Sequence, residues 1–165
     1  MYSLSPLKNY NLTGFEGDDI PSRMPLTKAH RIVAMEVEES VHYSLNAPEA
    51  LDEWSRGTPY GGGTYRIGPL NRTAVCSLFH QLHCIRTLHT LLAKGSHGDA
   101  SHHHAQHCLR YLREEILCDA NTSLEPGDFT LSNFSEKRVE ATYMCRDWNQ
   151  VYNEVEHNWA VWRNS

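Results

Sequence analysis

The feature that most constrains this chain is a pentapeptide pattern, His-x-x-His-Cys, that occurs twice. The two copies occupy residues 80–84 and 104–108, and their first histidines stand 24 positions apart. Residues three or four apart on an α-helix share one face, with Cβ atoms about 5–6 Å apart. Each copy therefore presents two imidazoles to the same point when the segment that carries it is helical.

Both copies lie in segments whose apolar residues recur at helical spacing. The first segment, from about 75 to 92, carries a stripe of Leu78, Leu82, Ile85, Leu88, Leu91 and Leu92. The second, from about 102 to 118, carries Leu109, Leu112, Ile116 and Leu117. The short, turn-rich link at 94–101 favours an antiparallel helix pair. Such a pair brings together four imidazoles, those of His80, His83, His104 and His107.

Four converging imidazoles predict a metal site. One His-x-x-His alone is more often a surface or core feature, but its repetition with the same following cysteine favours metal binding. Neutral imidazole suits copper and zinc alike, with four ligands around one ion or two around each of two. Open positions remain for oxygen or substrate. His103 shares a helix face with His107 and is an alternative ligand.

Further segments accompany the motifs in a fixed order: Phe79 before the first, 109–113 after the second, then Cys118, 122–126 and 145–148. Together they resemble the UstYa-like family of fungal secondary-metabolite oxidases, over about residues 75–148. The resemblance implies a copper cofactor held by the four motif histidines. It also implies a peptide or small-molecule natural product as substrate and molecular oxygen as partner. The implied reactions are oxidative cyclisation, hydroxylation, desaturation or halogenation.

One position departs from the family pattern. A histidine is expected two residues before Cys145, and this chain has Tyr143 there. We therefore include Tyr143 among the candidate catalytic residues, as a redox or hydrogen-bonding group, with burial in the core as the alternative. The departure also leaves open a different ligand set or chemistry in this member.

The five cysteines cannot all pair, and leaving one free allows 15 pairings of Cys76, Cys84, Cys108, Cys118 and Cys145. We expect disulfides Cys84–Cys108, which would clamp the helix pair, and Cys118–Cys145. Cys76 is then a free, buried small residue. The alternative is a metal centre that uses Cys84 and Cys108 directly as ligands beside the histidines.

Composition and patterning predict a mainly α fold with a small β element. The 165 residues, 40% hydrophobic, suit an extended arm at 1–25 and one compact domain at 26–165. We expect the helix pair to pack with a C-terminal helix at about 146–162, whose stripe includes Trp148. A two-stranded sheet is expected from the alternating segment that runs from Val33 through Tyr43 and from 137–143.

Two shorter segments complete the predicted domain. Residues 46–54 read as an N-cap region and a short helix that packs through Trp54. The glycines at 61–63 lack the Lys-Ser/Thr of a phosphate loop, and we expect a flexible rim near the active site.

Several features bear on location and partners. Four Asn-x-Ser/Thr acceptors, at Asn11, Asn71, Asn121 and Asn133, and the expected disulfides point to the secretory pathway lumen, or to the lumenal side of a membrane. Family members carry a membrane anchor before this domain, and this sequence shows no run of about 18 apolar residues. The net charge of −5 and the lack of a basic stripe argue against a nucleic-acid partner. Homo- or hetero-oligomers stay open.

The sequence thus predicts a copper-dependent oxidative enzyme of fungal natural-product biosynthesis. A zinc protein with the same ligands is one alternative, although no glutamate stands as a base in a His-Glu-x-x-His pattern. A metal-free, disulfide-braced protein that guides a non-redox cyclisation or serves as a binding scaffold is the other.

Overall fold

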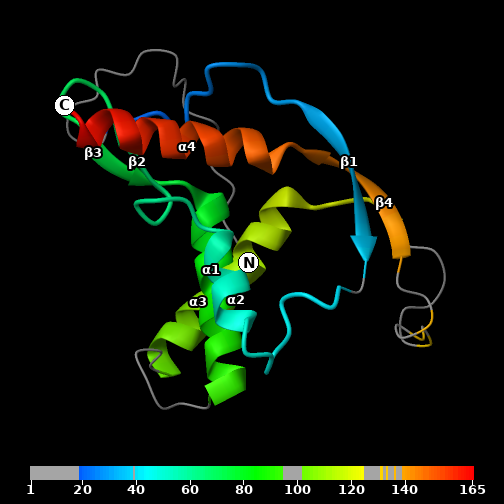
Figure 1. Cartoon of the computed structure of the whole chain (residues 1–165). Coiled ribbons are helices and arrows are strands. Elements are labelled where there is room, and N and C mark those ends of the chain that lie inside the picture. Colours follow the sequence, from blue (N-terminus) through cyan, green and yellow to red (C-terminus); the bar gives the residue numbers. More distant parts are fainter. Residues whose placement is uncertain are drawn as a thin grey trace.

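The computed structural model describes residues 19–38, 40–94, 102–124 and 139–165, together with 131, 133 and 136. Figure 1 shows helices as its dominant elements, with strands at two places, which confirms a mainly α fold with a small β element. Of the expected N-terminal arm, 1–18 fall outside the described residues and 19–25 form neither helix nor strand. Within the described residues, no helix has the length and apolar character needed to cross a membrane.

The two motif-bearing helices form the predicted antiparallel pair (Figure 1). α2 (Ser77–Lys94) carries the first motif and α3 (His102–Asp119) the second. Cross-helix contacts join His83 to His104 and His80 to His107, so residue numbers rise along one helix as they fall along the other. The bounds agree with the predicted ones because the apolar stripes keep helical spacing throughout both segments.

The C-terminal helix is also confirmed, as α4 (Trp148–Arg163). Its N-cap is Asp147, whose carboxylate accepts a hydrogen bond from the Asn149 backbone N–H at 3.1 Å. Val151 and Val155 are buried and form the core cluster with Phe79 of α2. Trp148 was expected on the same buried stripe, but it is 44% exposed because it begins the helix, beyond this cluster.

The predicted two-stranded sheet is formed by β1 (Ile32–Glu38) and β4 (Val139–Arg146), which pair antiparallel. Its register places Met35 opposite Tyr143. β1 ends at Glu38, where its pairing with Val139 at the start of β4 ends, so Val41 and Tyr43, which were expected to continue it, lie outside the strand. Tyr43 also has a positive φ of 60°, which is not an extended conformation. Strands β2 (Thr64–Ile67) and β3 (Arg72–Val75) form a separate hairpin that contacts α4.

The glycine run between α1 and β2 packs onto the core, which corrects the expected flexible rim. Gly61 and Gly63 both have positive φ, at 81° and 78°. A Cβ atom on Gly61 would collide with the Trp159 ring, and one on Gly63 with Phe79. Glycine is needed here because the backbone lies directly against two aromatic side chains.

The short helix α1 (Ala50–Arg56) begins later than the sequence suggested. Ala50 N–H donates to the Ala47 carbonyl at 3.1 Å, so the segment around Pro48 is a turn that leads into the helix. Trp54 does pack, as expected, but against Tyr43 and His89 at centroid distances of 5.2 and 5.3 Å.

All five cysteines are free in the structure, so the expected disulfides are not formed. Cys84 and Cys108 are fully buried and their thiols contact each other across the helix pair. Cys118 is exposed at the end of α3, whereas Cys145 belongs to the β1–β4 sheet. Cys76 is only partly buried, against the core cluster.

Candidate metal centre

The helix pair places the four motif histidines in two cross-helix pairs. The Nε2 atoms of His83 and His104 are 3.3 Å apart, and those of His80 and His107 are 3.4 Å apart. This convergence follows from the sequence because each motif puts its histidines on one helix face and the antiparallel packing turns the two faces together. The structure thus brings the four imidazoles together as two pairs, and their role as metal ligands stays a prediction.

The spacing of these nitrogens fits a transition metal. Two nitrogens that each lie 2.0–2.1 Å from one ion at a tetrahedral angle are about 3.3–3.4 Å apart, which is the separation within each cross-helix pair. Imidazole nitrogen is a good donor to copper and to zinc. The donor set and its spacing therefore fit the copper that the sequence resemblance implies, and fit zinc as well.

A cysteine joins one of the two pairs. Within the described residues, one group of three candidate ligands has all its donor atoms within 4.8 Å of one another, and it consists of His80, Cys84 and His107. Burial, a contact with the Cys108 thiol and the charge of that group raise the pKa of the Cys84 thiol to about 12. The cysteine of the first motif thus lies beside the imidazoles as a potential ligand.

The surroundings of the two α2 imidazoles favour their neutral, metal-binding form. Burial and the neighbouring His107 lower the pKa of His80, against an opposing effect of Glu115. Burial, followed by the charge of Arg86 and the proximity of His104, lowers the pKa of His83. Because a protonated imidazole cannot bind a metal, both shifts extend the pH range in which these ligands are available.

Tyr111 is a site residue that the sequence interpretation missed. Its ring lies 4.1 Å from that of His80 and stacks near His107 at 6.2 Å, both between centroids. Burial, with the nearby Glu115 carboxylate as a further cause, raises the pKa of Tyr111 to about 12. Glu115 also accepts a hydrogen bond from the Gln81 side chain at 3.0 Å. The signal was present in the sequence, since residues 107, 111 and 115 follow one another at helical spacing.

The remaining candidates lie elsewhere. His103 is exposed, and its ring is absent from the imidazole contacts found among the described residues. Tyr143 lies in β4 opposite Met35, and its role as a redox or hydrogen-bonding group stays a prediction. The tyrosine placed against the imidazoles is Tyr111.

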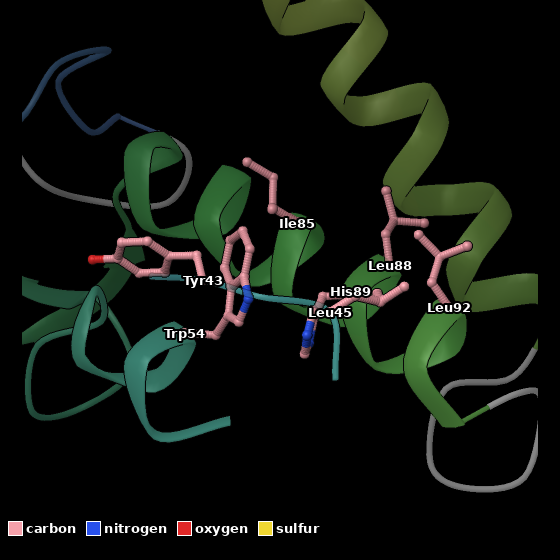
Figure 2. A pocket seen from close by; sticks show the side chains of 7 residues that line it. All are labelled: Tyr43, Leu45, Trp54, Ile85, Leu88, His89 and Leu92. Carbon is pink, nitrogen blue, oxygen red and sulfur yellow. The ribbon is translucent and has the colours of Figure 1, made fainter. Parts of the chain in front are cut away.

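A pocket of about 250 Å³ opens on a different side of α2 (Figure 2). Its lining is mostly apolar and consists of Tyr43, Leu45, Trp54, Ile85, Leu88, His89 and Leu92. His89 is buried, and its Nε2 atom lies 3.1 Å from the Ser44 carbonyl. At 3.6 residues per turn, residues 85, 88, 89 and 92 point away from the face that carries the motif histidines. The pocket is therefore separate from the candidate metal centre.

The fold and the site thus describe a protein in which two consecutive antiparallel helices, α2 and α3, carry two facing pairs of histidines. Residues 28–163 match the sequence model of the UstYa family, described as mycotoxin biosynthesis protein UstYa. The chain belongs to this family. No solved structure matches it.

Curated relatives carry names of oxidative enzymes. The UstYa family oxidase phomYb of Diaporthe leptostromiformis is 27% identical over 124 residues, which cover 64% of this chain and 49% of the relative. The chlorinase cctP2 of Talaromyces islandicus is 33% identical over 91 residues, 51% and 27% of the two chains. The oxidase ustYa of Aspergillus flavus is 40% identical over 96 residues, 53% and 43%. This chain spans about half or less of the length of these relatives.

Proposed function

We propose that this protein is a copper-dependent oxidative enzyme of fungal natural-product biosynthesis, acting on a peptide or small-molecule intermediate. Membership of the UstYa family and the oxidase names of relatives support the oxidative role. The observation that carries the proposal is the pair of cross-helix Nε2 distances, 3.3 and 3.4 Å, which suit metal ligation. Acid–base side chains alone do not functionalise a C–H bond, whereas a redox metal does so with oxygen as oxidant.

The chain's own residues have distinct tasks in this proposal. His80, His83, His104 and His107 hold the metal, and bound copper supplies the one-electron chemistry. Tyr111 covers one side of His80 and, with its pKa raised to about 12, keeps its phenolic proton at neutral pH. The half-buried imidazoles leave one side of the cluster open to solvent, since His107 is exposed. Substrate and oxygen reach the site from that side.

Exposed glycosylation acceptors support the expectation on location. The asparagines of three acceptor triplets, Asn71, Asn121 and Asn133, are exposed and accessible to glycosylation. We propose that the protein works in the lumen of the secretory pathway. Its proposed partner there is its substrate. Mass spectrometry of the protein from a fungal host, before and after glycosidase treatment, tests this point. Unmodified asparagines throughout would contradict it.

Metal analysis combined with EPR tests the function. We expect purified protein to bind Cu(II) with a nitrogen-rich signal, and the His83→Ala/His107→Ala double variant to lose most of it, because each substitution breaks one imidazole pair. The matched control is His157→Ala, which removes an exposed histidine of α4. If the double variant bound as much copper as the wild-type protein, the proposal would be overturned. Exclusive uptake of zinc would move the assignment to a zinc protein.

A further inference from the structure

The distances between the imidazole rings show which two histidines can bind one metal ion at a tetrahedral angle. Ring centroids are 5.3 Å apart for His83–His104 and 5.5 Å apart for His80–His107, but 6.3 Å apart for successive histidines of either helix. An ion bound through Nε2 lies about 3.2 Å from the ring centroid. Rings 6.3 Å apart therefore reach one ion only from nearly opposite sides. The cross-helix pairs reach it near the tetrahedral angle.

The two cross-helix pairs have different surroundings. The His80–His107 pair has the buried Cys84 thiol within 4.8 Å of its nitrogens, and Glu115 exerts a negative charge on His80. A thiolate is a strong ligand for late first-row transition ions, and a nearby carboxylate favours a cation. This pair is therefore the core of a three-ligand position.

The second pair lacks these advantages. Within the described residues, no third histidine, cysteine or carboxylate group joins His83 and His104 in a cluster of three. The positive charge of Arg86 acts on His83 and opposes the binding of a further cation. Among the described residues, His83 and His104 therefore supply two nitrogens to an ion here, whereas the other pair is joined by a thiol.

We propose that the chain holds two metal positions of unequal strength: a tight one formed by His80, His107 and the Cys84 thiolate, and a weak one formed by His83 and His104. This inference deepens the proposed function and rests on it. Ion binding at the tight position displaces the thiol proton of Cys84 to solvent. The second motif's cysteine, Cys108, contacts the Cys84 thiol from within the helix interface and holds it in place.

Anaerobic titration of reduced, chelator-treated protein with Co(II) tests the proposal, because Co(II) accepts the same ligands without oxidising a thiolate. We expect two Co(II) ions per chain. The first should produce a sulfur-to-cobalt charge-transfer band and the second should not. Cys84→Ser should abolish that band and weaken the first site at least about tenfold. His83→Ala should remove the second ion and leave the band unchanged.

Matched controls separate ligation from folding. Cys76→Ser removes a partly buried cysteine that packs against the core cluster, and it should keep both ions and the band. His107→Ala should lose the band while Cys84 remains present. Because the band is measured first in wild-type protein, the result does not depend on any variant being stable.

The outcomes distinguish this inference from the proposed function. One Co(II) ion per chain, lost with either cross-helix pair and lacking a sulfur band, would overturn the two-position inference and leave the metal-dependent function standing. Two ions without a sulfur band, or a band that survives Cys84→Ser, would overturn the role of Cys84. A wild-type protein that takes up no metal would remove both proposals together.

Discussion

His80 and His83 make the stability of the metal-free protein depend on pH. Their pKa values are lowered in the fold, chiefly by burial, whereas in the unfolded chain they titrate near the ordinary histidine value of about 6.5. Between the two values the unfolded state binds more protons, so the free energy of unfolding falls as the pH falls. About one pH unit above 6.5 and beyond, neither state is protonated and this contribution is complete.

We therefore expect urea unfolding in the presence of a chelator to show lower stability at about pH 5.5 than at about pH 7.5. The double variant His80→Gln/His83→Gln should show a flatter pH dependence, since two of the shifted groups are gone. His157→Gln is the control because His157 is exposed. An equally steep dependence in the double variant would show that other groups cause it.

Gly62 and Gly63 provide a comparison in which only the neighbours differ. Both have positive φ, at 69° and 78°, but a Cβ atom on Gly63 would collide with Phe79, whereas one on Gly62 meets open space. Gly62→Ala should cost about 1–2 kcal/mol from its backbone conformation alone. Gly63→Ala should cost roughly 1–3 kcal/mol more. Chemical denaturation of both variants checks this, and equal losses would contradict the packing argument.

Single residues show where sequence interpretation succeeds and where it stops. The four motif histidines were predictable because helical spacing fixes which side chains share a face. Tyr111 lies on the same face as His107, but an aromatic residue there reads equally well as core. Whether the cysteines form disulfides was not predictable. Their contacts depend on how α2 and α3 are rotated about their axes relative to each other, and the sequence does not specify this rotation.

At the scale of elements, the bounds of the two long helices α2 and α3 were predictable, whereas those of the short helix α1 and of the strands were less so. α2 and α3 each span several turns, so an apolar period of three to four repeats often enough to fix the ends. β1 ends at Glu38 because its pairing with β4 ends there, although the alternation of the sequence continues to Tyr43. A short strand offers too few repeats to reveal such a break.

The start of α4 depends on Asp147. This buried carboxylate caps the helix through the Asn149 N–H and forms an ion pair with Arg31, next to β1. Asp147→Asn keeps a capping oxygen and removes the charge, whereas Asp147→Ala removes both. We expect Asp147→Ala to lower the free energy of unfolding by about 1–2 kcal/mol through the lost cap, and Asp147→Asn to cost less. Thermal unfolding of the two variants measures the difference, and equal stability of the two would contradict a capping role.

Metal should stabilise the helix pair, because each proposed ion joins α2 to α3. At a free concentration 100 times its dissociation constant, a ligand that binds only the folded state adds about 2.7 kcal/mol. We expect added Cu(II) to raise the melting temperature of wild-type protein and a chelator to reverse the change. The His83→Ala/His107→Ala variant should respond weakly. A melting temperature indifferent to metal in the wild type would argue for the metal-free scaffold.

At the scale of the whole molecule, the core that the described residues form contains few large side chains. Its fully or nearly fully buried large side chains include Phe79 and Val155, which join α2 to α4. Val155→Ala should therefore cost about 2 kcal/mol, from two lost methyl groups and the space they leave. Denaturant unfolding monitored by circular dichroism measures this cost. Ala160→Ser, on the exposed side of the same helix, is the control and should be close to neutral.

The β1–β4 sheet also sets the order in which the protein is assembled during its synthesis. Arg31, just before β1, and Asp147, just after β4, pair across 116 positions of sequence. At about 5–20 residues per second, roughly 6–23 s separate the appearance of the two. β1 spends that interval with unpaired backbone groups, and the alternating charges Glu36 and Glu38 discourage its association with other chains. The helix pair, whose residues are all synthesised earlier, can form before the sheet closes.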